Sequence, residues 1–280
     1  MQLGIFAKTF AGSDPDQVLA QVRTAGFNLA HYNMACSGLA SMPDTINPEI
    51  THEIKNASVK TDVAIAAVSG TYNMAHPDPQ VRNQGHARLD VLASHCAAMG
   101  TQLITLCTGT RDAEDQWQNH LENNSKEAWR DMLVSMDVAL VIAERYNIIL
   151  GIEPELSNIV NSASKARLLI SEMQSPRLKI IFDAANLFEI ATLNEQRYII
   201  SKSIEPVWEH IVMAHAKDRD AAGLFASAGQ GVLDFTHYLK SLHETGFNGP
   251  MIAHGLKSDE AEDVYSFLKS KANEAEINIT

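Results

Sequence analysis

The sequence has little positive charge, few cysteines and no long hydrophobic run. Lys and Arg number 22 against 34 Asp and Glu, so the formal net charge is −12. Binding a nucleic-acid backbone or an anionic membrane surface requires clustered cations, so this balance argues against both kinds of partner. The three cysteines, Cys36, Cys96 and Cys107, form no CxxC pair. They suggest no disulfide framework, which is typical of a reducing cytosol.

The apolar runs are all too short for a membrane-spanning helix. Residues 138–143 form one of the longest, and a spanning helix needs about 18 residues or more. The first five residues have no basic segment followed by an apolar one, so they predict a strand rather than a signal peptide. We therefore expect a soluble, cytoplasmic protein, and 280 residues are enough to bury a large core.

Segments typical of strands and of helices alternate along the whole chain. Eight short β-rich runs are predicted as strands, at residues 3–10, 28–34, 63–71, 102–110, 147–155, 178–186, 210–218 and 250–256. Apolar residues at helical spacing predict helices at residues 14–24, 79–99, 125–145, 164–173, 235–245 and 258–272. This alternation predicts a parallel sheet joined by crossover helices.

Eight such units in one chain fit a (β/α)₈ TIM barrel, and a doubly wound sheet is the second choice. The chain has no Pro- or Ser-rich linker and no block of charge that would mark a domain boundary. We expect one α/β domain over residues 1–280. In a barrel of this kind, the chemistry lies where strands end and the following loops begin.

Four successive predicted strands end in a carboxylate or an imidazole: Glu153, Asp183, His215 and His254. Taken singly, a strand-end Asp or Glu often caps the next helix, and a lone His is often a core residue. Four together at one end of a barrel favour a metal site. Mixed carboxylate and imidazole ligands suit Mn²⁺, Fe²⁺, Co²⁺ or Zn²⁺, and suit Mg²⁺ less well.

The order of these motifs resembles the xylose-isomerase-like TIM-barrel superfamily. That group contains sugar isomerases and epimerases and also endonuclease IV. The resemblance covers nearly the whole chain and is strongest over residues 147–256. The motifs that carry it are Glu153-Pro154-Glu155, Asp183-x-x-Asn186, His215-x-Lys217-Asp218 and Gly229-Gln230-Gly231. The glycine-rich segment resembles the flexible loop after strand seven that helps to close the site in that superfamily.

The resemblance implies a ligand set for one divalent metal ion. In the ketose 3-epimerase branch, a Glu, an Asp, a His and a second Glu bind the ion. The first three correspond to Glu153, Asp183 and His215, whereas the fourth position holds His254 in this chain. Mn²⁺ is the first candidate, with Co²⁺, Fe²⁺, Zn²⁺ and Mg²⁺ as alternatives. In that branch, the two glutamates also flank the substrate as opposed acid and base, so His254 is a departure that puts symmetric epimerisation in doubt.

The function that the resemblance implies is a divalent-metal-dependent isomerase or epimerase. The substrate would be a small ketose or keto-sugar acid, and the reaction would pass through a metal-stabilised enediolate, with Glu153, His254 and Lys217 as catalytic residues. The alternatives are a metal-dependent lyase (decarboxylase or dehydratase) on a 3-oxo or keto-sugar acid, and a non-catalytic sugar-binding barrel. Homo-oligomers are expected from the resemblance. Endonuclease activity is not expected, because that branch needs a richer ligand cluster and this chain is acidic.

Further polar residues in the predicted loops are candidates for binding the substrate: Asn73, Arg111, His120, Glu155, Asn186 and Arg219. Arg111 either binds a carboxylate or phosphate, or pairs with Asp112 or Asp115. Asn73 and His120 either bind hydroxyl groups or cap turns.

Lys217 follows His215 by two residues, so the two side chains share one side of the strand. Lys217 either binds a carboxylate or oxyanion, or pairs with Asp218 or Asp220. His31, on the second predicted strand, could face the same end of the barrel, and its role is left open.

Overall fold

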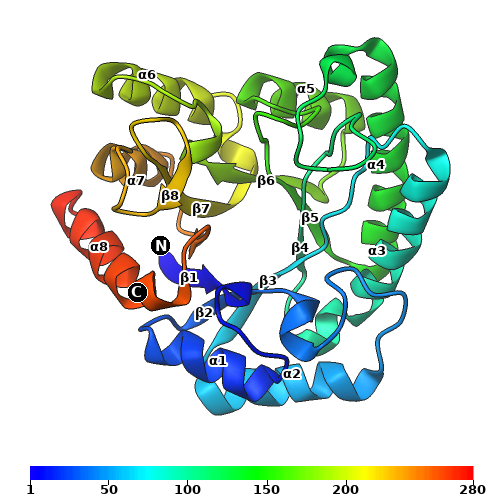
Figure 1. The fold of residues 1–280 in the computed structure, drawn as a ribbon, viewed down its shortest axis with the longest axis horizontal. Coiled ribbons are helices and arrows are strands. Elements are labelled where there is room, and N and C mark those ends of the chain that lie inside the picture. Colours follow the sequence, from blue (N-terminus) through cyan, green and yellow to red (C-terminus); the bar gives the residue numbers. More distant parts are fainter. Residues whose placement is uncertain (280) are drawn as a thin grey trace.

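The computed structural model describes residues 1–279 as a closed barrel of eight parallel strands with eight α-helices outside it (Figure 1). Each barrel strand pairs with its neighbours, and β9 and β1 close the ring. The predicted (β/α)₈ fold is therefore confirmed. The barrel strands are β1 (Gln2–Phe6), β2 (Leu29–Tyr32), β3 (Ala64–Ser69), β4 (Leu103–Leu106), β5 (Ile149–Ile152), β6 (Leu178–Asp183), β7 (Ile211–Arg219) and β9 (Pro250–Ala253).

The helices that surround the barrel begin at well-formed caps. Asp14, Asn47 and Asp78 each accept a backbone N–H at the start of a helix whose first residue is proline, a combination that favours helix initiation. The helices are α1 (Pro15–Thr24), α2 (Pro48–Thr61), α3 (Pro79–Met99), α4 (Lys126–Tyr146), α5 (Ala163–Met173), α6 (Leu193–Ile204), α7 (Phe235–Glu244) and α8 (Ala261–Glu274).

Two α-helices and one strand were missing from the sequence prediction: α2, α6 and the short strand β8 (Phe225–Ser227). The apolar residues of α2 and α6 are separated by many polar ones, so their helical period is weak in the sequence. β8 pairs antiparallel with the end of β7 and forms a hairpin over the barrel mouth. This region was expected to be a flexible loop.

The lower half of the barrel interior is filled by apolar side chains. The inner cluster consists of Leu29, Ala67, Ile181, Met213 and Ile252. Glycine is required beside it, because a Cβ at Gly151 would lie 2.5 Å from Ile181 Cδ1. The barrel is therefore closed at its lower end, and polar side chains of the strands collect at the other end.

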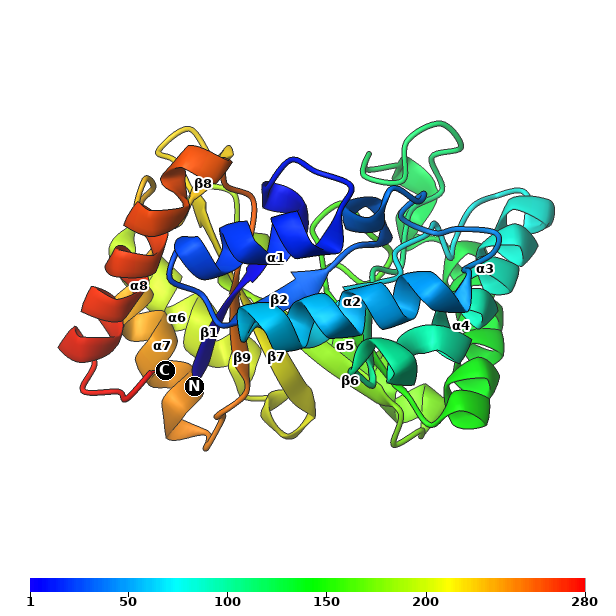
Figure 2. The ribbon, with the colours of Figure 1, turned by 90° about the horizontal axis from the view of Figure 1, so that it is seen from below.

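A second and larger core lies between the strands and the helices, and it extends to both ends of the chain. The N-terminal amine donates a hydrogen bond to Asn248 Oδ1 at 2.6 Å, and Figure 2 shows the two termini on the same side of the molecule. No helix within residues 1–279 combines the length and the apolar character needed to cross a bilayer.

Candidate functional site

The candidate site is one layer of polar side chains directly above the apolar plug of the barrel. Side chains alternate along a strand, so residues two apart face the same side. Asp183 follows Ile181 by two, His215 follows Met213, and His254 follows Ile252. The pairing of β6 with β7 brings Asp183 opposite His215, so the strand alternation places these groups in the barrel mouth.

Glu153, Asp183 and His215 form a buried cluster whose potential ligand atoms all lie within 4.8 Å of one another. His215 Nδ1 lies 3.1 Å from Glu153 Oε1. Both ring nitrogens of His215 and Asp183 Oδ2 are buried without a well-oriented hydrogen bond. Unsatisfied buried donors and acceptors are costly and need an explanation. Two carboxylates and an imidazole at this spacing fit a divalent cation.

Lys217 lies beside this cluster and contacts both of its carboxylates. Its Nζ is 3.0 Å from Glu153 Oε1 and 3.0 Å from Asp183 Oδ2. Burial by itself would lower the pKa of Lys217, but the two carboxylates outweigh burial and raise it. The ammonium therefore stays charged. The alternative prediction, that Lys217 pairs with Asp218 or Asp220, is wrong.

The pKa values of the two carboxyl groups shift in opposite directions. Burial would raise the pKa of Glu153, but His215 and Lys217 together hold it well below its usual range. Burial raises the pKa of Asp183, and Lys217 opposes that rise only in part. Glu153 is thus held in its ionised form.

His254 stands next to the cluster and contributes no atom to it. Its ring stacks on His215 with centroids 4.9 Å apart and on Phe6 at 4.5 Å. Burial and the nearby charges of Lys217 and His215 lower its pKa well below the usual value, and its Nδ1 has no hydrogen-bond partner. His254 is therefore a neutral imidazole in the barrel mouth, and its role as a fourth ligand stays a prediction.

His31 and Phe6 belong to the site, although the sequence did not assign them to it. The His31 ring lies 5.8 Å from that of His215, and its Nε2 is 2.9 Å from Thr105 Oγ1. Burial lowers the pKa of His31 to about 3, so it is neutral. One signal was available: His31 follows Leu29 by two, and Leu29 belongs to the apolar plug.

A cavity of about 320 Å³ opens beside the cluster, and three of the predicted substrate residues line it: Glu155, Asn186 and Arg219. The amide of Asn186 donates to Glu153 Oε1 at 2.8 Å, so it links the cavity to the cluster. Burial, and then the charge of Glu153, raise the pKa of Glu155 to about 8.

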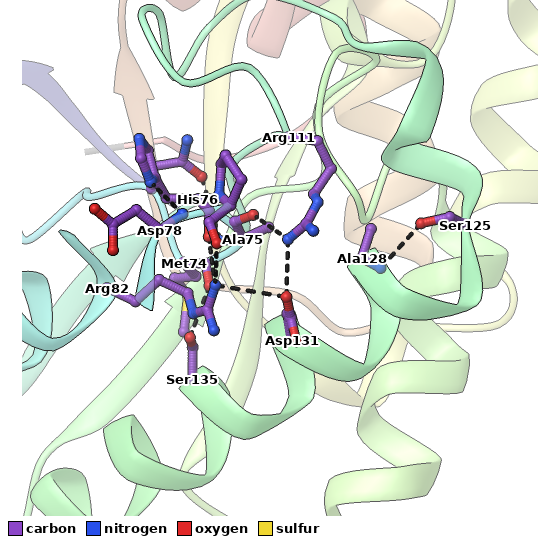
Figure 3. Close-up of polar contacts among 12 residues, drawn as sticks. Met74, Ala75, His76, Asp78, Arg82, Arg111, Ser125, Ala128, Asp131 and Ser135 are labelled. Carbon is purple, nitrogen blue, oxygen red and sulfur yellow. Dashed lines mark hydrogen bonds and ion pairs between the residues drawn. The ribbon is translucent and has the colours of Figure 1, made fainter. Parts of the chain in front are cut away.

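The other predicted substrate residues are engaged elsewhere. Arg111 Nη1 donates to Asp131 Oδ2 at 2.9 Å and to the Ala75 carbonyl at 3.1 Å, and Arg82 contacts the same carboxylate (Figure 3). The prediction that Arg111 pairs with Asp112 or Asp115 is therefore wrong. The distant Asp131 lies on α4, and only the tertiary fold brings it close.

Asn73 and His120 organise loops by hydrogen bonds to the backbone. Asn73 Oδ1 accepts from the amides of Ala75 and Thr110. His120 Nδ1 accepts from the amide of Glu122. For these two residues, the structure favours the turn-capping interpretation over the binding of hydroxyl groups.

Comparison with known proteins gives the family. Residues 19–271 match the profile of the xylose isomerase-like TIM barrel. The chain belongs to this family.

Individual relatives are epimerases. L-Ribulose-5-phosphate 3-epimerase UlaE of Escherichia coli is 25% identical over 268 residues, which cover 93% of this chain and 89% of that protein. Two solved structures share the fold. A D-tagatose 3-epimerase-like protein has a TM-score of 0.79 at 15% identity, with 99% of this chain and 98% of that chain covered. The 3-keto-D-glucoside 4-epimerase YcjR from E. coli has a TM-score of 0.76 at 16% identity, with 96% and 99% covered.

Proposed function

We propose that this protein is a divalent-metal-dependent epimerase or isomerase of a small ketose or keto-sugar acid. The observation that carries the proposal is the buried cluster of Glu153, Asp183 and His215, with ligand atoms within 4.8 Å of one another. The epimerase relatives support the same reaction class. Mn²⁺ is the ion we expect first from the resemblance to the ketose 3-epimerases, and mixed oxygen and nitrogen donors are compatible with it.

When bound, a divalent ion supplies Lewis-acid polarisation of a substrate carbonyl. Glu153 is the base that we assign to the removal of the proton from the neighbouring carbon. Its Oε1 accepts hydrogen bonds from Asn186 and Lys217. These two contacts fix the carboxylate plane, and a fixed base transfers protons more efficiently.

Lys217 and His254 are assigned the two remaining roles. The Lys217 ammonium stabilises negative charge that develops on the substrate oxygen when the proton leaves. His254, with its unpartnered Nδ1, is assigned the second face of the substrate: the neutral imidazole accepts the proton in one direction of the reaction, and the imidazolium so formed, or formed from solvent, returns it in the other. In this assignment, one carboxylate and one imidazole do the work that two carboxylates do in a symmetric site.

The test measures exchange of a substrate C–H for deuterium in heavy water by NMR, with Mn²⁺-loaded protein and a panel of ketoses. We expect exchange with at least one ketose. Glu153→Gln should lower its rate by about 100-fold or more, the usual contribution of a general base. It should also lower the retained Mn²⁺ from about one equivalent, measured by ICP-MS after desalting.

The matched control is Glu205→Gln on the exposed surface at the end of α6, which should change neither quantity. Exchange by Glu153→Gln at the wild-type rate would remove Glu153 from the mechanism. Wild-type protein that retains no ion would remove the metal site.

A further inference from the structure

The cavity beside Glu153 is polar but holds few cations. Its polar lining consists of the carboxyl groups of Glu155 and Glu189, the amides of Asn119 and Asn186, Ser157 and one guanidinium, Arg219. Within residues 1–279, Arg219 is the only Lys or Arg that lines this cavity. A phosphate or carboxylate in a binding site is normally met by Arg or Lys, or by a group of backbone N–H donors. Whether these groups are free therefore decides which substrates the cavity favours.

Arg219 is engaged by the protein itself. Its Nε donates to the Ala185 carbonyl at 2.6 Å, and its Nη1 donates to the Gly223 carbonyl. One face of the guanidinium lies over the Phe225 ring, 4.1 Å from the centroid. Arg219 thus joins the loop after β6 to the β7–β8 hairpin and shapes the cavity wall. The Nε donor and one N–H of Nη1 are used on two carbonyl groups, so the fork that includes Nε is closed to an anion.

The glycine-rich loop after β8 already encloses an anion, the side chain of Asp218. The carboxylate of Asp218 accepts four backbone N–H groups, from Arg219 at 2.8 Å, Leu233 at 2.9 Å, Gly229 at 3.0 Å and Gly231 at 3.1 Å. A Cβ at Gly231 would lie 2.3 Å from Asp218 Oδ1, so the loop is built around this carboxylate. Such a nest of N–H groups is what cradles phosphate in other proteins, and here an internal group fills it.

The other two cations that the sequence offered to an anion do not line this cavity. Lys217 contacts Glu153 and Asp183 and is assigned above to the reacting oxygen, and Arg111 contacts Asp131. The cavity keeps the carboxyl groups of Glu155 and Glu189, and the amides of Asn119 and Asn186 each keep one polar atom beyond their bonds to Asn123 and Glu153. Such groups hydrogen-bond to hydroxyls. Hydroxyl groups are what an unmodified sugar presents along its chain.

We infer that this protein acts on an uncharged ketose, not on a sugar phosphate or a sugar acid. The inference rests on the proposed function and specifies its substrate class. It separates this chain from the relative whose name includes a 5-phosphate. A free ketose and its phosphate ester differ in charge at the end of the molecule that is remote from the carbon that loses its proton.

The test compares kcat/KM for C–H exchange between matched substrates, using Mn²⁺-loaded wild-type protein. Each free ketopentose and ketohexose is assayed beside its terminal phosphate ester and its keto-sugar acid. We expect the free ketose to be favoured by at least about tenfold, as discrimination by unmatched polar groups gives. A phosphate ester or acid that reacts as well or better overturns the inference and leaves the proposed function intact. The absence of exchange with every compound overturns both.

Two variants at one position test whether missing positive charge is what excludes a phosphate ester. Leu224 lines the cavity and is 67% exposed, so a longer side chain is tolerated there. Leu224→Lys should raise kcat/KM for the phosphate ester about threefold to fivefold over Leu224→Gln, which is what one exposed ion pair contributes. Equal use of the ester by the two variants would show that something other than missing positive charge excludes it, and would overturn the charge argument.

Discussion

The ammonium of Lys217 lies 3.0 Å from the Oε1 atom of Glu153, within the cluster that we assign to a metal ion. The same ammonium is 3.0 Å from Asp183. In the proposed metal site, Lys217 would therefore compete with the ion for the same two carboxylates. The lysine neutralises these carboxylates in the structure, and the competition would lower the affinity for the ion.

Lys217→Met should destabilise the metal-free protein and increase its response to metal. Two buried carboxylates lose their counter-ion, and breaking a buried pair costs about 3–5 kcal/mol. The midpoint of thermal unfolding should fall by several degrees without metal. Mn²⁺ should then raise it by more than in the wild type, because the competing charge is gone. Differential scanning calorimetry with and without Mn²⁺ measures both effects.

Lys240→Met is the control for that experiment. Lys240 is exposed on α7, so neither the midpoint nor the Mn²⁺ response should change. A Mn²⁺ response in Lys217→Met no larger than that of the wild type would contradict the competition.

His254→Phe should separate proton removal from inversion. The phenyl ring can keep the stack on Phe6 and His215 but cannot carry a proton. If Glu153 works on one face and His254 on the other, C–H exchange should stay within about tenfold of wild type while formation of the epimer falls by about 100-fold or more. Deuterium NMR and chromatography of the sugars measure the two rates. Equal losses in both rates would argue against a second proton-transfer group at this position.

Arg111→Met should lower stability more than it changes substrate binding. Arg111 is 8% exposed and pairs with the half-buried Asp131, so its loss leaves a carboxylate without its closest partner. We expect the free energy of unfolding to fall by about 2–3 kcal/mol and KM to change by less than about threefold. The double variant Arg111→Met/Asp131→Leu should recover part of the loss. A large rise in KM with unchanged stability would return Arg111 to the substrate site.

Asp234→Ala should lower the free energy of unfolding at neutral pH. The difference from the wild type should disappear in acid. Asp234 caps α7 by accepting from the His237 amide at 3.0 Å and pairs with Arg197 at 2.6 Å. Burial opposes its ionisation, but these contacts lower the pKa of Asp234 below the usual 3.8. The stabilisation is therefore complete above pH 3.8 and lost as the pH falls through the lower folded-state pKa. Above about pH 5, we expect a loss of about 1–2 kcal/mol.

Chemical denaturation between about pH 2.5 and pH 7 gives the free energies of unfolding for that comparison. Asp234→Asn keeps a capping oxygen without the charge and should lie between the wild type and Asp234→Ala. If the stability deficit of Asp234→Ala grew in acid, the carboxylate would not be the stabilising form of this side chain.

The barrel and most of the ligand set were predictable, because both depend on local pattern. Alternation of strands and helices fixes the order of elements, and period-two alternation carries Asp183, His215 and His254 to one end of the barrel. The helices α2 and α6 escaped prediction because their apolar period is weak. The same alternation made His31, two residues after Leu29, a candidate for this end of the barrel but gave it no role.

The sequence by itself therefore determined the fold class, the strand ends that bear chemistry and the overall acidic charge. Only the tertiary structure decided which charges meet. Asp131 pairs with Arg111 across 20 residues, Lys217 lies between two carboxylates from other strands, and Asp218 fills the glycine-rich loop. Such pairings depend on side-chain reach and on contacts between distant segments, which no local period encodes. They also decide which cations remain free to meet a substrate.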